Sequence, residues 1–377
     1  MKKILYLCDF PIDSIGGAQK SLVTMANAMN EQQYDVYVTS ENITNKDFLL
    51  NCHFKVLEFS KGNGKIEQVI RKLIFLLKIY QKIKPDIIHV QFAQYAYVLM
   101  LAKKLKLIKK DVRCIYTDRH FFTAYNQRYQ KMFINQINDW NDIIFTTNIN
   151  KQEWEKALYG KEYKTNFHVI YNVLDPEWFE SNHNVTVNKD HNQLVIGFAG
   201  RYVDWKRWDT VEEICIKLLS IDDIKVNVAI SYDKGNSSSE KDMYIYIEKL
   251  KKILNNRIEI FVNVDTKKMM QFYDNLDLFI LTSEKESFGR TLIEAMSRNC
   301  SVLSANSGGA PEVIGRKDLL FSVGDVSTAL SKILEYKNNF FKLENDKIYF
   351  KNRVNTLFTI DSMIKKSIQV YEGDMKC

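Results

Sequence analysis

Short apolar runs alternate with amphipathic segments along almost the whole chain, a pattern typical of parallel α/β proteins. Runs such as 3–8, 86–90 and 194–200 are short and apolar, as buried strands are. Segments 18–29 and 65–84 carry apolar residues at helical spacing. The pattern predicts further strands, with helices between most of them, at 34–40, 112–117, 142–147, 168–172, 226–230, 258–262, 278–281, 300–303 and 319–322.

One polar stretch interrupts this alternation, at residues 181–193, which are rich in Asn and His and lack an apolar period. We interpret it as a linker. A chain of 377 residues is long enough for two cores. We therefore predict two doubly wound, Rossmann-like domains, residues 1–182 and 183–357, each with a parallel sheet, facing one another across a cleft.

Composition places the chain among soluble globular proteins, with 26% charged and 46% hydrophobic residues. Its six cysteines are scattered, with no C-x-x-C pair and no zinc-like spacing, which suits reduced thiols in the cytoplasm. The N-terminal apolar run ends at Asp9 and is too short for a signal peptide. No apolar segment approaches the roughly 20 residues that span a bilayer.

The net charge is +7, and the basic excess is concentrated in residues 65–113. Such a patch could meet an anionic membrane, a nucleic acid or an acidic substrate. No nucleic-acid-binding module is recognisable, so that partner is the least supported. An anionic membrane surface and an ordinary solvated helix face both remain open.

The segment Leu281–Met296 has the most informative arrangement. It begins at the end of an apolar strand, passes through a polar loop that contains Gly289, and opens a helix. Such a turn presents backbone N–H groups to a phosphate. Glu286 in the loop and Glu294 in the helix are expected to face one ligand. Beside a phosphate, a carboxylate must contact an uncharged group, and sugar hydroxyls are the obvious candidates.

Two cations follow strand 194–200 in one loop, Arg201 and Lys206. Gly200 allows close approach, and the two charges suit a diphosphate, although a solvated basic loop is the simpler interpretation. Together with the glutamates they indicate a nucleotide-sugar. No Asp-x-Asp metal motif occurs, so leaving-group charge would be stabilised by Arg201, Lys206 and helix-terminal N–H groups. The absence of P-loop, dinucleotide and G-x-S-x-G motifs disfavours kinases, dehydrogenases and hydrolases.

Two features of the first half also occupy positions at which ligands bind. Gly16-Gly17 stands at the entrance of a helix, where a plain tight turn is an equal interpretation. His120 follows strand 112–117, where open α/β sheets bind ligands, and it could equally be a capping or packing residue.

These residues together resemble a GT-B-fold glycosyltransferase of the large retaining family four, which includes bacterial capsule, lipopolysaccharide and teichoic-acid enzymes. The resemblance covers nearly the whole chain. It is carried by Gly16-Gly17-Ala18-Gln19, His120, Gly200-Arg201 with Lys206, Glu286-Ser287-Phe288-Gly289 with Glu294-Ala295-Met296, and Gly308-Gly309 with Glu312.

The resemblance implies a hexosyltransferase that acts with retention and needs neither metal nor other cofactor. Its donor would be a nucleotide-diphosphate sugar, most commonly of uridine. Its acceptor would be a hydroxyl of a cell-surface glycan, wall polymer, lipid-linked or protein molecule. The enzyme would work in the cytoplasm or peripherally on the inner face of the cell membrane.

The resemblance also assigns roles to residues. Arg201 and Lys206 would bind the diphosphate, Glu294 the ribose hydroxyls, and Glu286 the donor sugar. The implied catalytic residues are His120, Glu286, Arg201 and Lys206. The implied donor-binding residues are Gly16, Gly17, Arg201, Lys206, Glu286, Ser287, Phe288, Gly289, Arg290, Thr291 and Glu294. The first domain would bind the acceptor, with the C-terminal helix, about 358–377, packing back on it.

Some positions depart from the family pattern. Gln19 stands where the family often has an acidic residue, and Gln91 stands where a second His is frequent. The segment 172–175 lacks the glycine that is common there. These departures concern the acceptor more than the donor. Two alternatives remain: a non-catalytic partner subunit that stabilises an active enzyme, and a GT-B-fold sugar-nucleotide epimerase. The retained cations and glutamates favour activity, and we identify no extra acid/base residues for an epimerase.

Overall fold

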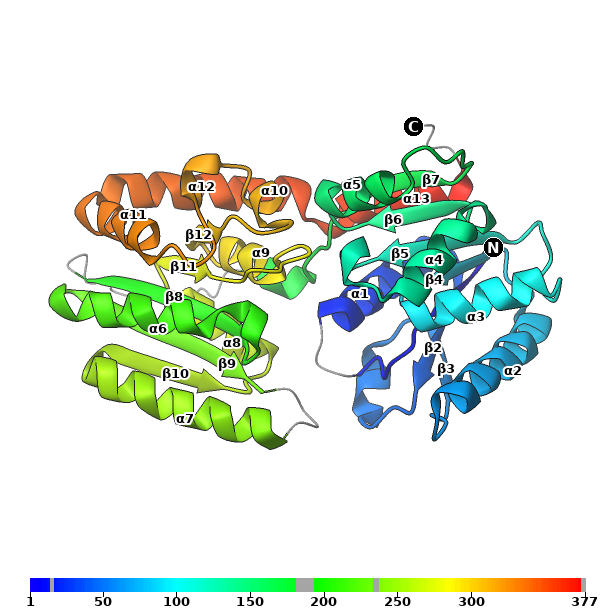
Figure 1. The fold of residues 1–377 in the computed structure, drawn as a ribbon, viewed down its shortest axis with the longest axis horizontal. Helices are drawn as coiled ribbons and strands as arrows, with labels where there is room; N and C mark the ends of the chain where they lie inside the picture. The colour runs from blue at the N-terminus through cyan, green and yellow to red at the C-terminus, as the bar shows by residue number, and fades with distance from the viewer. Residues whose placement is uncertain (14–16, 181–192, 233–236, 374–377) are drawn as a thin grey trace. The chain divides into compact units, whose positions relative to one another are not determined.

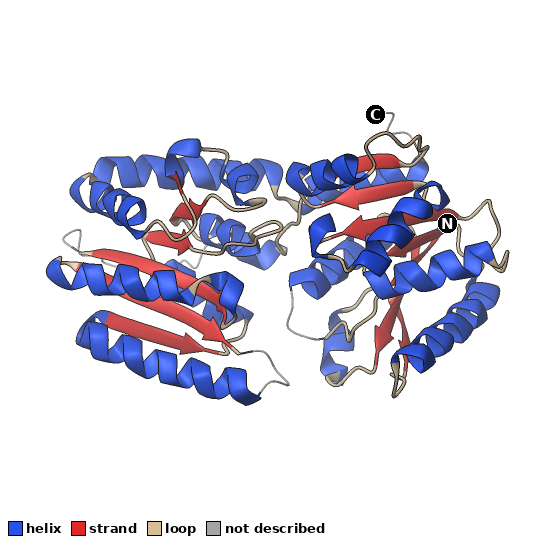
Figure 2. Cartoon of the chain, viewed as in Figure 1, coloured by secondary structure: helices blue, strands red, loops and turns tan. Residues whose placement is uncertain are grey.

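The computed structural model describes residues 1–13, 17–180, 193–232 and 237–373 (Figure 1). The chain forms two compact units: Met1–Val173 with Ile360–Cys377, and Leu174–Thr359. The predicted boundary at 182/183 and all but the last residue of the predicted linker 181–193 fall within 181–192, outside the described residues. Each unit is built around one parallel sheet with helices packed on both of its faces (Figure 2).

The first unit holds a seven-stranded sheet in the order β3-β2-β1-β4-β5-β6-β7. In register, Leu5 of β1 lies beside Tyr37 of β2 and Ile88 of β4. The strands are β1 Lys3–Leu7, β2 Asp35–Glu41, β3 Lys55–Phe59, β4 Ile87–Val90, β5 Arg113–Asp118, β6 Asp142–Phe145 and β7 Asn166–Val169. The helices are α1 Gly17–Glu31, α2 Lys65–Ile83, α3 Ala93–Lys104, α4 Gln127–Asn135, α5 Asn148–Ala157 and α13 Ile360–Glu372.

The two faces of this sheet bury two separate cores. Along β1, Leu5 and Leu7 pack into the cluster covered by α2, α3, α4 and α5, while Ile4 and Tyr6 pack into the cluster covered by α1 and α13. This alternation follows from the two-residue period of a strand. Because both faces are covered, β1 is apolar at every position except its first, which is why its sequence shows a continuous run.

The C-terminal helix α13 is fixed to this core by a buried polar network. The Tyr371 hydroxyl lies 2.7 Å from the Tyr6 hydroxyl and 2.9 Å from His89 Nδ1. His89 Nε2 lies 2.7 Å from Thr117 Oγ1. Burial lowers the pKa of His89 to about 3, so its ring is neutral at physiological pH. His89 is therefore a structural residue of the core.

The second unit holds a six-stranded parallel sheet in the order β10-β9-β8-β11-β12-β13. Its strands are β8 Leu194–Arg201, β9 Ile224–Ser231, β10 Ile258–Val262, β11 Leu278–Leu281, β12 Ser301–Ala305 and β13 Leu320–Phe321. Its helices are α6 Trp208–Lys217, α7 Ser237–Leu254, α8 Thr266–Asp274, α9 Arg290–Ser297, α10 Ala310–Ile314, α11 Val326–Asn338 and α12 Phe340–Leu357. The predicted fold class, two parallel Rossmann-like α/β domains, is confirmed.

Some elements were missed or misplaced by the sequence pattern. Strand β3 lies at the edge of its sheet and was missed, because it is only five residues long and Lys55 and Glu58 interrupt its apolar residues. Helix α5 buries only Asn150 and Trp154 and is otherwise polar. Between strands 226–230 and 258–262 the apolar spacing predicts a helix over 244–254, but α7 begins at Ser237, because its first turns are polar and carry no apolar period. Within the described ranges, no helix is long and apolar enough to cross a membrane.

Candidate functional site

Three loops meet at the carboxyl edge of the second sheet, after β8, β11 and β12, which are neighbouring strands. The Glu284 amide donates to the carbonyl of Trp205 at 2.9 Å, and the Thr282 hydroxyl donates to the carbonyl of Lys206 at 2.9 Å. The Gly309 amide donates to the carbonyl of Glu286 at 2.8 Å. These bonds hold the three loops together, so the side chains that they carry have a defined framework.

The structure brings two of the predicted site residues into direct contact across this framework. Lys206 Nζ lies 2.7 Å from Glu286 Oε2, and the two side chains are 17% and 16% exposed. A Cβ on Gly200 would approach Lys206 Cδ to 3.3 Å, so the glycine leaves room for the lysine stem. A cation and a carboxylate therefore stand together at the rim, both within reach of solvent.

Arg201 is the last residue of β8, five residues before Lys206, and it is more exposed. Its guanidinium carbon is 6.0 Å from the centre of the Trp205 ring, and its carbonyl accepts a 2.8 Å hydrogen bond from Trp208 Nε1. The backbone is thus fixed while the charged group extends outward. Arg201 and Lys206 both present positive charge at this sheet edge.

The turn into α9 depends on a glycine. Gly289 has φ +96°, a left-handed conformation that disfavours other residues, and its Cβ would meet Leu292 at 2.9 Å. Phe288 beside it is 2% exposed and packs edge-on against Phe358. Its side chain belongs to the core, so Phe288 can offer a ligand only backbone groups. Ser287 lies in the same turn, before α9 begins at Arg290.

Glu294 lies in a separate set of contacts from Glu286. Its Oε1 is 3.1 Å from Arg290 Nε, and its Oε2 accepts a 3.1 Å hydrogen bond from the Tyr273 hydroxyl. Burial raises the pKa of Tyr273, so the phenol keeps its proton and donates. The carboxylate has further acceptor positions and is 12% exposed.

Buried hydroxyls at this edge were missed by the sequence reasoning. Ser283 is 1% and Ser307 is 4% exposed. Among the described residues, neither hydroxyl has a hydrogen-bond partner, and the same holds for the Thr291 hydroxyl. Buried polar groups are normally paired, so these three are available to a ligand. The signal that could have found the serines is position, since each stands two residues after a strand, β11 and β12.

In the first unit, His120 is exposed directly beyond β5. Its amide donates to Asp118 Oδ1 at 3.0 Å, and its ring lies edge-on to Tyr125, 6.1 Å between centres. Buried Asp118 also accepts from the Tyr125 hydroxyl at 2.6 Å and from Trp154 Nε1 at 2.5 Å. The backbone of His120 is therefore fixed while its imidazole faces solvent. Gly17 is exposed at the first position of α1, and Gly16 lies outside the described residues.

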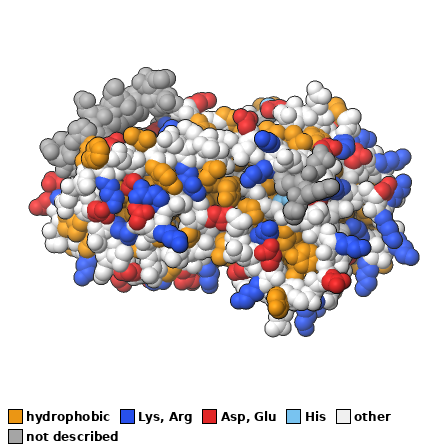
Figure 3. Space-filling model, turned by 90° about the horizontal axis from the view of Figure 1, so that it is seen from above, with side chains coloured by type: hydrophobic (Ala, Val, Ile, Leu, Met, Phe, Trp, Pro, Cys, Tyr) orange, Lys and Arg blue, Asp and Glu red, His pale blue; other side chains and the backbone are white. Residues whose placement is uncertain are grey.

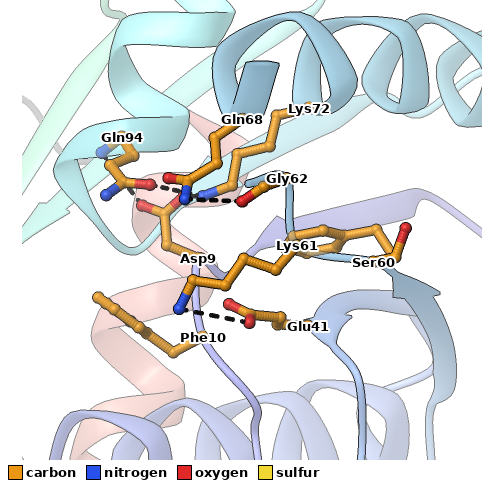
Figure 4. Close-up of a pocket in the computed structure, with 10 residues that line it drawn as sticks. Asp9, Phe10, Glu41, Ser60, Lys61, Gly62, Gln68, Lys72 and Gln94 are labelled. Atoms are coloured by element: carbon orange, nitrogen blue, oxygen red, sulfur yellow. Dashed lines mark hydrogen bonds and ion pairs between the residues drawn. The ribbon is translucent and has the colours of Figure 1, made fainter. Parts of the chain in front are cut away.

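The first unit has a pocket of about 50 Å³ at the carboxyl ends of β1, β2 and β3 (Figure 4). Asp9 Oδ1 lies 2.5 Å from Lys72 Nζ, which also donates to Gln94 Oε1 at 2.8 Å. Nearer the surface, Lys61 pairs with Glu41 at 3.7 Å. The pocket is lined by Asp9, Phe10, Glu41, Phe59, Ser60, Lys61, Gly62, Gln68, Lys72 and Gln94. Its charges balance, which makes it a polar but not an anion-selective pocket.

Across the residues that the structure describes, no three His, Cys, Asp or Glu side chains are grouped to hold a metal ion.

The chain was compared with known protein families. Residues 15–178 match the family described as Glycosyltransferase Family 4, and residues 180–351 match the family described as Glycosyl transferases group 1. The two matches follow one another and together cover most of the chain.

Individual relatives are distant in sequence. An uncharacterized 41.2 kDa protein in the cps region of Klebsiella pneumoniae is 22% identical over 367 residues, covering 93% of this chain and 96% of that protein. The capsular polysaccharide biosynthesis glycosyltransferase CapM of Staphylococcus aureus is 26% identical over 175 residues, covering 45% and 44%. Among solved structures, Anabaena Alr3699/HepE in complex with UDP and glucose superposes with a TM-score of 0.80 at 19% identity, covering 99% of this chain and all of that one. This likeness shows a shared fold.

Proposed function

The chain belongs to the family 4, group 1 glycosyltransferases and has their GT-B fold, and we propose that it transfers a hexose from a UDP-sugar with retention of configuration. The acceptor is a hydroxyl of a cell-surface glycan, wall polymer, lipid-linked or protein molecule. The reaction needs no metal or other cofactor. UDP as carrier is supported by the UDP and glucose bound to the Anabaena protein, and a capsule-type role by the relation to CapM.

The observation that carries this proposal is the Lys206–Glu286 pair at the carboxyl edge of the second sheet. A diphosphate requires cations and a sugar ring requires hydrogen-bond acceptors, and this pair supplies one of each in contact. When a diphosphate binds Lys206, the Glu286 carboxylate is released to accept from a sugar hydroxyl. Arg201 adds a second cation to the leaving group.

In the reaction, charge develops on the diphosphate oxygen as the bond to the anomeric carbon breaks. Lys206 and Arg201 stabilise that charge, with help from backbone N–H groups of the turn that contains Ser287 and Gly289. The acceptor hydroxyl attacks the anomeric carbon on the face that the diphosphate leaves. The diphosphate oxygen takes the proton of that hydroxyl. Because the hydroxyl attacks from the same face that the diphosphate leaves, the configuration is retained.

The nucleoside half of the donor falls to α9. Glu294 uses its remaining acceptor positions for the ribose hydroxyls while Arg290 holds it in place. Thr291 supplies a hydroxyl that makes no hydrogen bond elsewhere in the described chain.

The acceptor and the sugar end of the donor involve the first domain, residues 1–182 with the helix 358–377, whereas residues 183–357 bind the nucleotide. His120 contacts the donor sugar through its exposed imidazole, and the backbone of Gly17, at the first position of α1, contacts the diphosphate. Gly16, which we also assign to the donor site, lies outside the described residues. The polar pocket at Asp9 and Lys61 offers the acceptor substrate side chains that donate hydrogen bonds and side chains that accept them. The enzyme acts in the cytoplasm or at the inner face of the cell membrane.

The test is turnover of a panel of UDP-sugars in the presence of EDTA, followed by UDP release and by NMR of the first sugar anomer set free. We expect slow hydrolysis of one UDP-hexose that releases the sugar with its original configuration. Glu286→Gln should abolish it. Release of the inverted anomer would contradict retention, and loss of activity on chelation would contradict metal independence. Binding without turnover would identify a non-catalytic partner subunit, and an isomerised UDP-sugar an epimerase.

A further inference from the structure

Tyr273 of α8 is a buried residue whose hydroxyl reaches α9, the helix that carries Glu294. Helices α8 and α9 pack against one another (Figure 1). The Tyr273 ring is fully buried and lies edge-on to the rings of Trp178 and Phe279, with ring centres 6.0 and 5.5 Å apart. Its hydroxyl donates to Glu294 Oε2 at 3.1 Å. The packing of the ring therefore fixes the point from which this hydrogen bond is made.

The Glu294 carboxylate is held through both of its oxygens. Oε2 accepts from the Tyr273 hydroxyl, and Oε1 lies 3.1 Å from Arg290 Nε. Arg290 is in turn steadied by Asp175, whose Oδ2 lies 4.0 Å from the NH2 group of the guanidinium. An ionised carboxylate has about four acceptor positions, shared between its two oxygens. Within the described chain, each oxygen of Glu294 therefore keeps an acceptor position for a ligand.

Two acceptor positions on one fixed carboxylate match a pair of neighbouring hydroxyls. The 2′ and 3′ hydroxyls of ribose lie on adjacent carbons, so each can donate to one oxygen of Glu294. Deoxyribose lacks the 2′ hydroxyl and leaves one oxygen without a ligand partner. Hydrogen bonds to a charged acceptor are the stronger kind, so the missing bond lowers affinity. A carboxylate that had to be aligned on binding would lose part of this preference, because the ordering has a cost.

Long-range charge does not provide the same selection. Over the second unit as seen in Figure 3 (left), acidic and basic side chains are interspersed and are not gathered by sign. An electrostatic field would in any case act alike on two nucleotides of equal charge. Discrimination between ribose and deoxyribose therefore has to come from a positioned group.

We propose that Tyr273 is a positioning residue of the donor site, which aligns the Glu294 carboxylate with the two ribose hydroxyls. The site thereby selects sugars carried by ribonucleoside diphosphates over sugars carried by deoxyribonucleoside diphosphates. This inference rests on the proposed function, which assigns Glu294 to the ribose. It adds Tyr273 to the donor site and names the class of donor that the site refuses.

The experiment is calorimetric titration of the full chain with UDP and with 2′-deoxyuridine diphosphate, with EDTA present. We expect wild type to bind UDP roughly 10–100-fold more tightly, the effect of one hydrogen bond to a charged acceptor. Tyr273→Phe keeps the buried ring and removes only the hydroxyl. It should lower the ratio of the two affinities by about fivefold, because the carboxylate loses one of its two anchors.

The matched control is Tyr336→Phe, in a similar arrangement of the same unit. Tyr336 is 2% exposed, its hydroxyl donates to Asp346 Oδ2 at 2.7 Å, and Arg316 pairs with the other oxygen. The tyrosine and the carboxylate lie on α11 and α12, outside the loops that form the site. Thermal unfolding should show both variants folded with a similar loss of stability, but Tyr336→Phe should keep the wild-type ratio of affinities.

Equal affinity of wild type for the two nucleotides, or an unchanged ratio in Tyr273→Phe, would overturn the inference. A ratio lowered equally by Tyr336→Phe would do the same, because Tyr273 would then act only through stability. The wild-type comparison needs no variant and stands even if Tyr273→Phe does not fold. Failure of wild type to bind either nucleotide would overturn the donor site of the proposed function, and this inference with it.

Discussion

Each sheet carries a lysine–carboxylate pair at its carboxyl edge. The two pairs differ in how deeply they are buried and in how many further hydrogen bonds they make. In the first unit, Lys72 and Asp9 are 7% and 1% exposed. Lys72 also donates to Gln94, and Asp9 accepts from the amides of Gln94 and Tyr95 at the start of α3. In the second unit, Lys206 and Glu286 are 17% and 16% exposed, and the described residues provide that pair with no other side-chain hydrogen bond.

The difference separates a structural pair from one that can exchange partners. Removing two charges from water is costly, and further hydrogen bonds must offset the cost, as they do around Asp9. Burial raises the pKa of Asp9 although Lys72 and the amides oppose the shift. A partly exposed pair with one mutual bond is less firmly held than a buried, fully hydrogen-bonded one, and it yields more readily to a phosphate. Burial and saturation, more than residue type, therefore distinguish the two sites.

The largest effect expected from this comparison is on stability. Lys72→Met should lower the free energy of unfolding by about 3–5 kcal/mol, because it leaves the Asp9 carboxylate buried without its cation. Lys206→Met, at the partly exposed pair, should change it by less than about 1 kcal/mol. Denaturant unfolding without nucleotide measures both. The variant Asp9→Asn/Lys72→Met should recover part of the loss, and equal destabilisation by Lys72→Met and Lys206→Met would remove the distinction.

The second effect is on catalysis. Here the partly exposed pair of the second unit, not the buried pair of the first, should matter most. Lys206→Met should lower kcat for UDP release by roughly 10²–10³-fold, as removal of a donor that stabilises developing negative charge does. The control is Lys249→Met, an exposed lysine on α7 that pairs with Glu212. It should keep wild-type turnover. Full activity in Lys206→Met would show that its charge does not act on the leaving group.

The pH dependence of stability tests a second buried polar group of the first unit, His89. His89 titrates near pH 3 when folded and near 6.5 when unfolded, so the unfolded chain binds more protons between these values. Its contribution is complete above about pH 6.5 and is lost as the pH falls, by about 2 kcal/mol at about pH 5. Wild type should therefore lose that much more unfolding free energy between neutral pH and about pH 5 than His89→Gln does. Parallel pH profiles would contradict a neutral buried His89.

The smallest effect tests partner exchange at Lys206. If Glu286 competes with phosphate for this lysine, Glu286→Gln should bind UDP more tightly, by up to about fivefold, while it loses turnover of the UDP-sugar. Titration with UDP and a rate measurement on the same variant check the two signs. Glu286→Asp, which keeps the charge, is the matched control and should not gain affinity. Weaker UDP binding in Glu286→Gln would mean that the pair does not compete with the nucleotide.

The sequence was sufficient for the fold because most strands are buried on both faces and show as apolar runs. It was insufficient for β3, whose edge position leaves it half solvated, and for α5, whose buried face is only two residues wide. At the site, order along the chain indicated Lys206 and Glu286 but not that they touch. Asp9–Lys72 and the unpaired hydroxyls of Ser283 and Ser307 depend on tertiary burial, which no spacing along the chain reports.

The most direct test of a donor site at the second sheet is calorimetric titration with UDP and other nucleoside diphosphates, with EDTA present. It compares wild type, Arg201→Ala/Lys206→Ala, and the control Lys249→Ala/Lys251→Ala, which removes two exposed cations from α7. We predict micromolar binding of UDP to wild type and control and none to Arg201→Ala/Lys206→Ala. Equal binding by all three proteins, or no nucleotide binding by wild type, would contradict the account.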